Sequence, residues 1–453
     1  MNITILSALC IFIITYVLMF SFQKIRPHVS IVSALVFVII GSIGVLPGFQ
    51  YSWIDAIRAV DWNVLMMISG TMGTVFLFID SGMPDRMSDL IVARVHSVKI
   101  MVLALSLFAG IISAFVDNVA TVLMIAPVAL SICRSLNISP VPAIICISIS
   151  SNLQGAATLV GDTTSLLLAK QAGLDFMDFF FVKGKPGMFW VTEAGALVTS
   201  FVILYMFRGN NAEIHVERKT QVRDRVPAIL LLSTIISLIL VSFIPYKENA
   251  APGQFYKPGI TNGAICLFFF LIALANQVNT DRTFDKVLNA IQEIDYYTIA
   301  LLTGLFIVIG GVERAGLIDY IGSLLASLSG DGSRASVFLV YTVIVWASVL
   351  LSAFIDNIPY TATMLPVVAV VAKRLSAAGG LDLDPNLLYF GLIVGATLGG
   401  NLTPIGASAN ITGIGILRKE GYEVKTAEFM NYSVPFTLIA VLTGYILLWI
   451  IWM

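Results

Sequence analysis

Apolar residues in this chain gather in long runs that short polar segments separate. A helix that crosses a bilayer needs roughly 20 predominantly apolar residues. The segments near this length that we predict to be helices are residues 2–22, 29–46, 63–80, 188–207, 227–245, 259–276, 296–312 and 432–452. Residues 82–97 mix charged and apolar positions, which predicts an amphipathic helix at the membrane surface. The pattern is that of a polytopic membrane protein.

Two stretches with a polar centre repeat the same sequence. SAFVDNVATVLMIAPV at residues 113–128 aligns without a gap with SAFIDNIPYTATMLPV at residues 352–367. Each places an Asp-Asn pair, at 117–118 and at 356–357, inside otherwise apolar sequence. Carboxylates at membrane depth are costly, and internal duplication is typical of transporters. We therefore predict that both pairs have a functional role.

Both halves of the chain also interrupt their helices. The stretches 100–135 and 335–376 carry the Asp-Asn pairs near their centres, which predicts re-entrant hairpins. Irregular backbone at membrane depth is tolerated only where protein encloses it or where it lines a wet cavity. The stretches 141–172 and 387–417 contain the aligned segments GAATLVG and GNLTPIG. In each of them we predict a helix that is unwound at its middle.

The duplication predicts the fold class, an all-α polytopic membrane protein of two inverted repeats. It would have about ten spanning helices, two re-entrant hairpins and two broken helices. Residues 1–207 are predicted to form the first repeat, residues 208–226 a cytoplasmic linker, and residues 227–453 the second repeat. Each half is predicted to cross the membrane five times. Because this number is odd, the second half has the opposite orientation to the first. The distribution of basic residues favours a cytoplasmic loop at Lys24 and Arg26, which puts both termini outside.

Composition agrees with this class. Of the 453 residues, 58% are hydrophobic and 12% are charged, whereas soluble domains average about 25% charged residues. The four cysteines and three histidines show no metal-ligand spacing, so we expect no cofactor and no metal beyond Na+. No nucleophile and base stand in the arrangement that an enzyme active site needs, so we do not expect the protein to be an enzyme.

The repeated motifs supply candidate ligands for a substrate or an ion. A hairpin tip and an unwound helix leave backbone groups without intrahelical partners, and short polar side chains add oxygen ligands suited to Na+ or H3O+. The predicted substrate- and ion-binding residues are Asp117, Asn118, Thr121, Thr158, Asp162, Thr163, Asp356, Asn357, Thr361, Asn401, Thr403, Ser408 and Asn410.

The charges of these motifs bear on the cargo. Asp162 breaks the symmetry of the two halves, because Ala407 stands at its matching position. A carboxylate without a basic neighbour in sequence is suited to carry a transported proton. None of the four aligned segments, at 113–128, 155–161, 352–367 and 400–406, contains Lys or Arg, so a cation or a neutral solute fits them better than an anion.

Together the motifs resemble the arsenite permease and NhaD-type sodium/proton antiporter branch of the ion transporter superfamily, which also contains divalent-anion/sodium symporters. The resemblance spans essentially the whole chain. It rests on the two aspartate-containing stretches, on SNLQGAATLVGDTTSLLLAKQAGLDFMDFF at 151–180 and on GGNLTPIGASANITGIGILRKEGY at 399–422. It implies that hairpin tips and broken helices bind substrate and ion, and that homodimers work by an elevator-like movement. The dicarboxylate symporters carry Ser-Asn-Thr at the hairpin tips, whereas this chain has Asp-Asn-Val and Asp-Asn-Ile.

We therefore expect a multi-pass protein of the cell membrane, a secondary active transporter that exports arsenite or antimonite in exchange for protons. Two alternatives stay open: a Na+/H+ antiporter, and a Na+-coupled anion symporter. The coupling ion is then H+ or Na+. The expected partners are a small inorganic solute or ion, membrane lipid and a second copy of the chain, with an arsenic-pump ATPase subunit if arsenite is the cargo. Nucleic acid is not expected. A channel would not need a hairpin and a broken helix in inverted duplicate.

Overall fold

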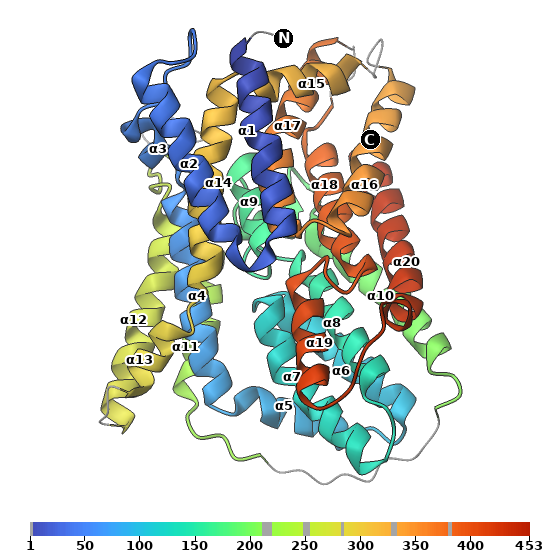
Figure 1. The fold of residues 1–453 in the computed structure, drawn as a ribbon. Coiled ribbons are helices and arrows are strands. Elements are labelled where there is room, and N and C mark those ends of the chain that lie inside the picture. The colour runs from blue at the N-terminus through green and yellow to red at the C-terminus, as the bar shows by residue number, and fades with distance from the viewer. Residues whose placement is uncertain (1–2, 211–219, 248–253, 282–284, 328–332, 379–382) are drawn as a thin grey trace.

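The fold is almost entirely helical (Figure 1). The computed structural model describes residues 3–210, 220–247, 254–281, 285–327, 333–378 and 383–453, so residues 211–219 of the predicted linker lie outside the described residues. The elements of the first half are α1 (Ile3–Ser21), η1 (Gln23–Ile25), α2 (Arg26–Ile43), α3 (Trp53–Ala59), α4 (Trp62–Asp80), α5 (Met83–Val92), α6 (Val98–Ser113), α7 (Asn118–Ser135), α8 (Val141–Gly155), α9 (Thr163–Ala172), η2 (Phe176–Phe179), the antiparallel strands β1 (Phe181–Val182) and β2 (Lys185–Pro186), and α10 (Met188–Met206). Those of the second half are α11 (Val226–Ser242), α12 (Thr261–Asp281), α13 (Asp285–Gln292), α14 (Tyr296–Arg314), α15 (Leu317–Ser327), α16 (Arg334–Ser352), α17 (Asn357–Ala378), α18 (Asn386–Gly399), η4 (Gly400–Leu402), α19 (Ser408–Lys419) and α20 (Thr426–Trp452).

Matching residues of the two halves begin and end matching helices. Asp61 caps α4 by accepting a 2.9 Å hydrogen bond from a backbone N–H of its first turn. Asp295, at the aligned position, caps α14 in the same way at 2.9 Å. The aligned glycines Gly82 and Gly316 both have a positive φ, 73° and 78°, which L-residues with a side chain rarely adopt. The sequence duplication is therefore also a duplication of local structure.

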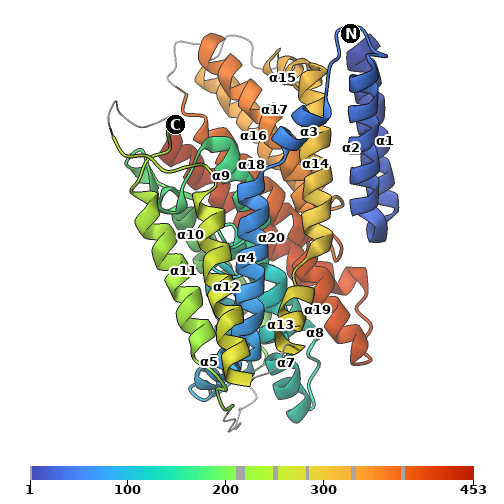
Figure 2. The same ribbon diagram turned by 90° about the vertical axis from the view of Figure 1, so that its left-hand side faces the viewer.

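Helices of one half pack against helices of the other in matching pairs. α2 packs on α14, and α4 packs on α12; α12 is the counterpart of α2, and α14 is the counterpart of α4. Figures 1 and 2 show α4, α11 and α12 side by side, with α1 and α2 at another edge. α9 packs on α17, and α19 packs on α7, so each broken helix contacts the hairpin of the other half. The predicted fold class is confirmed.

Both hairpins and both broken helices are present. α6 and α7 meet around residues 114–117, and α16 and α17 meet around residues 353–356. Figure 1 shows α6 and α7 in the lower part of the molecule and α16 and α17 in the upper part, so the hairpins enter from opposite ends. The breaks lie at residues 156–162, between α8 and α9, and at residues 400–407, between α18 and α19.

Each break is fastened to the hairpin tip of its own half by the same contact. The hydroxyl of Thr158 donates a hydrogen bond to the backbone carbonyl of Ala114. The hydroxyl of Thr403, at the aligned position, donates to the backbone carbonyl of Ala353. Both threonines are buried. Their hydroxyl protons are engaged by backbone, so in this conformation they hold the tip and the break together.

Gly161→Ala is expected to lower the stability of the protein, because the break passes too close to neighbouring backbone for a side chain. A Cβ there would lie 2.5 Å from the carbonyl oxygen of Gly155 and 2.6 Å from that of Ser113. Overpacking of this kind costs about 1–3 kcal/mol. Thermal unfolding in detergent measures the loss. Gly415→Ala, in α19 with nothing within 4 Å of the added Cβ, is the control. Equal unfolding midpoints for the two variants would contradict the prediction.

The helices suit a multi-pass membrane protein. Ten helices of the described chain are long and apolar enough to cross a membrane. They include α7, α16 and α17 of the hairpins, whereas α11, with 17 residues, is slightly shorter. Both chain termini lie at the same end of the molecule in Figure 1, as two halves of five crossings require. The amphipathic helix predicted at 82–97 is α5, while α3, α13, α15 and the two strands were not predicted.

Candidate transport site

Carboxylates stand at the start of three helices that meet inside the molecule. Asp117 precedes α7 and accepts hydrogen bonds from two of its first backbone N–H groups, at 2.9 and 3.3 Å. Asp356 precedes α17 and accepts one such bond at 3.1 Å. Asp162 precedes α9. A negative charge at these positions complements the positive end of the helix dipole, so all three aspartates also have a structural role.

Asp356 is paired with a cation that the motifs themselves do not contain. Nη1 of Arg26 lies 3.0 Å from Oδ2 of Asp356, and the two side chains are 8% and 9% exposed. Nε of Arg26 donates to the carbonyl of Met19 at 3.1 Å. Arg26 is therefore buried at the start of α2, not part of an exposed loop. The expectation that no cation offsets these carboxylates fails for Asp356, because its partner is 330 positions away in sequence.

Asp117 and Asp162 show no ion pair with any residue that the structure describes. Both stand where the first break meets the first hairpin tip, because a Cβ on Gly161 would lie only 2.9 Å from the carbonyl oxygen of Ala114. Asp162 is 4% exposed, and its Oδ2 accepts hydrogen bonds from the Thr164 hydroxyl at 2.8 Å and the Asn357 amide at 3.4 Å. Asp117 is half-buried. Two neighbouring carboxylates without a counter-ion are suited to bind a proton or Na+.

A chain of buried amides joins the first hairpin to the second break. Nδ2 of Asn118 donates to Oδ1 of Asn152 at 3.0 Å, and Nδ2 of Asn152 donates to Oδ1 of Asn401 at 3.0 Å. Nδ2 of Asn152 also lies 2.7 Å from the carbonyl of Thr397, the residue aligned with it in the other half. Asn152 was not among the predicted ligands. Its position three residues before GAATLVG, on the same helix, is the signal that could have identified it.

The other predicted ligands lie at the same tips and breaks. The hydroxyl of Thr121 donates to a carbonyl of the hairpin tip at 3.0 Å, and the amide of Asn410 donates to two carbonyls of the second break, each at 3.2 Å. Thr163 is buried at the start of α9, and Ser408 is half-buried at the start of α19. Thr361 has a buried hydroxyl without a hydrogen-bond partner in the described part of the chain. The predicted residues therefore gather in one region, but several already bond backbone.

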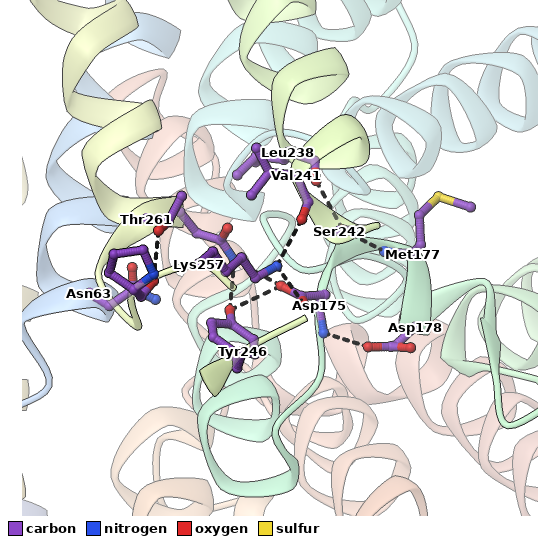
Figure 3. A network of polar contacts seen from close by, with 12 residues as sticks. Asn63, Asp175, Met177, Asp178, Leu238, Val241, Ser242, Tyr246, Lys257 and Thr261 are labelled. Carbon is purple, nitrogen blue, oxygen red and sulfur yellow. Dashed lines mark hydrogen bonds and ion pairs between the residues drawn. The ribbon is translucent and has the colours of Figure 1, made fainter. Parts of the chain in front are cut away.

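A second polar cluster joins the two halves away from the hairpin tips (Figure 3). Nζ of Lys257 donates to Oδ2 of Asp175 at 2.6 Å and to the carbonyl of Val241 at 3.0 Å. The hydroxyl of Tyr246 and the amide of Asn262 donate to Oδ1 of Asp175, at 3.0 and 3.3 Å. Burial and the nearby Asp175 raise the pKa of Tyr246, so its hydroxyl stays a donor. The cluster fixes the α11–α12 connection to the segment after α9.

A cavity of about 640 Å³ lies beside this cluster. Lys257 and Lys170 contribute to its wall, and Lys170 pairs with Asp61 at 3.5 Å. Leu159 and Leu166 also line it. These two residues flank Asp162 in sequence, so the cavity extends from the α11–α12 connection toward the first break.

Lys257→Met is expected to destabilise the protein, because it leaves the buried carboxylate of Asp175 with only neutral donors around it. Tyr246 and Asn262 keep their hydrogen bonds, so the expected loss is about 2 kcal/mol. Thermal unfolding in detergent measures it. Lys247→Met, an exposed lysine of the same connection, is the matched control and should unfold like the unmodified protein. A loss no larger than that of the control would count against the cluster's role.

Comparison with known sequences identifies relatives over the whole chain. The family model described as CitMHS, citrate transporter, matches residues 16–395. An uncharacterized transporter of Mycobacterium tuberculosis is 30% identical and covers 98% of this chain and 97% of its own. The 46 kDa membrane protein of Mycobacterium leprae is 28% identical and covers 98% of each chain. The P protein of Homo sapiens is 27% identical over 88% of this chain and 54% of its own length.

Solved structures of similar fold are transporters as well. The YdaH transporter of Alcanivorax borkumensis superposes with a TM-score of 0.59 at 15% identity, over 92% of this chain and 88% of its own. MtrF of Neisseria gonorrhoeae, described as one of a class of antimetabolite efflux pumps, superposes with a TM-score of 0.56 at 14% identity, over 94% of both chains. At such low identity these likenesses concern the fold alone.

Proposed function

Because the chain belongs to the CitMHS citrate transporter family and is a multi-pass membrane transporter, we propose that it is secondary active, with coupling ions bound at Asp117 and Asp162. The supporting observation is that these two carboxylates, at the first hairpin tip and the first break, show no ion pair in the described residues, whereas Asp356 is paired with Arg26. A carboxylate at membrane depth is costly, so one without a counter-ion is a candidate for a functional role. Protons or Na+ are the ions that these two residues suit.

As cargo we propose the neutral trihydroxide of arsenite or antimonite, exported in exchange for protons. The three aspartates outweigh the single guanidinium of Arg26, and a neutral solute adds no further charge to this region. Short amides such as Asn118, Asn152 and Asn401 supply hydrogen-bond partners for hydroxyl groups. The resemblance of the hairpin sequences to arsenite permeases supports the same cargo.

A citrate-like anion carried together with Na+ or protons is the second candidate. The description of the family and the presence of Arg26 beside Asp356 favour it. The start of α19 favours it too, because Ala407 leaves that helix without the carboxylate that the other three have. Coupling cations bound at Asp117 and Asp162 would offset the charge of such a cargo.

Flux in proteoliposomes tests the proposal and separates the cargoes. The purified protein is reconstituted with an internal pH indicator, and arsenite, citrate or NaCl is added under an imposed pH gradient. The proposal expects arsenite flux that follows the pH gradient and stops when a protonophore collapses it. Citrate-dependent ion uptake would instead establish the second candidate, and alkalinisation by Na+ alone a Na+/H+ antiporter. No gradient-dependent flux of any of these would overturn secondary active transport.

A further inference from the structure

The outer surface of α10 and α20 carries a groove that the transport site does not use. The two helices pack side by side (Figure 1), and the groove between their exposed faces has a volume of about 670 Å³. It lies on membrane-crossing helices, so its surroundings are lipid. From its shape and its charge we propose that this groove binds one anionic phospholipid, with the phosphate at Arg208 and an acyl chain along the helices.

The two ends of the groove differ in chemistry. Along α10 its wall runs from Val198 through Phe201 to Tyr205 and Arg208, and along α20 from Ile439 to Asn431. The side chains of Val198 and Phe201 are 38% and 66% exposed, so the end of the groove toward the membrane centre, here called its deep end, presents apolar surface. Arg208 and Asn431 form the opposite end. Arg208 lies two residues beyond the end of α10, and Asn431 lies near the start of α20. The groove therefore has a polar head region and an apolar tail region, as a phospholipid has.

The length of the groove matches one leaflet. Val198 and Met206, the last residue of α10, are eight positions apart, which corresponds to about 12 Å along a helix, and Arg208 follows two residues later. The hydrocarbon core of a bilayer is about 30 Å thick. A wall of this length thus reaches from the interface to about the middle of the membrane, which suits a lipid that stays in its own leaflet.

The head region has the charge and the hydrogen-bonding groups that a phosphate ester needs. The guanidinium of Arg208 lies 4.4 Å from the ring centre of Tyr205, is exposed, and pairs with no carboxylate of the described residues. Guanidinium groups bind phosphate through charge-assisted hydrogen bonds. Pro435 lines the groove and has no N–H, so the carbonyl of Asn431 lacks its usual partner one turn away. That carbonyl can accept from a headgroup hydroxyl.

Native mass spectrometry of the delipidated, detergent-solubilised protein tests this site. Phosphatidylglycerol and phosphatidylcholine with identical acyl chains are titrated in parallel. One phosphatidylglycerol per chain is expected to bind roughly tenfold more tightly than phosphatidylcholine. The reason is that phosphatidylcholine carries a choline cation beside its phosphate, whereas phosphatidylglycerol has none. Arg208→Gln should remove this preference. Arg94→Gln, an exposed arginine outside the groove, should leave it unchanged.

A second variant tests the tail region without touching the charge. Val198→Trp fills the deep end and should weaken the binding of both lipids. Glycerol phosphate, a headgroup without chains, should fail to compete. The proposal is overturned if Arg208→Gln binds phosphatidylglycerol like the unmodified protein, or if glycerol phosphate competes as well as the lipid. It is also overturned if Phe201→Cys forms disulfide-linked dimers in the membrane, because a second copy would then cover the groove.

Discussion

Asp162→Asn and Asp117→Asn are each expected to abolish cation-coupled flux while the protein still folds. Asparagine caps a helix about as well as aspartate, so the start of α7 keeps its hydrogen bonds. At position 162 the aspartate makes no capping bond to α9, and an asparagine oxygen can still accept from the Thr164 hydroxyl. Only the negative charge is lost. An ionic contact worth about 3 kcal/mol corresponds to roughly a hundredfold change in ion affinity. Gradient-driven flux in proteoliposomes, together with thermal unfolding in detergent, measures both effects.

Asp319→Asn is the control for these two variants. Asp319 is an exposed carboxylate on α15, away from the hairpin tips, and its loss should leave flux unchanged. Coupled flux that persists in both Asp117→Asn and Asp162→Asn would remove these residues from the ion site. If the two variants lose flux and also unfold at a much lower temperature than the unmodified protein, the residues have a structural role instead.

Arg26→Gln is expected to destabilise the protein more than any other single substitution considered above. It removes the guanidinium that lies 3.0 Å from the carboxylate of Asp356, and it leaves that buried carboxylate without a cation. Breaking a buried ion pair from one side typically costs 3–5 kcal/mol, because the remaining charge is uncompensated. The double variant Arg26→Gln/Asp356→Asn should recover much of the loss, since neither side chain is then charged.

A double-mutant cycle by thermal unfolding measures the coupling of this pair. Arg314→Gln is the control, because its pair with Asp55 is exposed, with the arginine side chain 60% accessible. Exposed pairs contribute less than about 1 kcal/mol. If Arg26→Gln loses no more stability than Arg314→Gln, the buried pair is not a strong contact. The same pair means that Asp356→Asn alone would disturb folding as well as transport.

The duplication made most of the architecture predictable from sequence. Asp61 and Asp295 align, and both cap a helix; the Asp-Asn pairs align, and both stand at a hairpin tip. The contacts between Arg26 and Asp356 and between Asn152 and Asn401 were not predictable, because they join residues about 250 to 330 positions apart. Periodicity reports which face of a helix is apolar, and it does not say which distant side chain completes a pair.

Some local structure was harder to predict, because its sequence signals are short. α3 has seven residues and is fixed by a reciprocal cap between Ser52 and Asp55, a signal much weaker than that of a spanning helix. Thr158 and Thr403 look like ligands in sequence, since a hydroxyl in an apolar segment suggests a polar partner. The structure provides that partner as a backbone carbonyl in both halves.

The exchange of Asp162 for Ala407 makes the two halves electrically unequal although their backbones correspond. With Asp356 balanced by Arg26, the aspartates of the tips and breaks that show no ion pair in the described residues both belong to the first half. A bound cation would accordingly rest off the pseudo-twofold axis, nearer to the first hairpin. The inward- and outward-open forms would then differ in energy, and release of the cation toward one side of the membrane would be easier than toward the other.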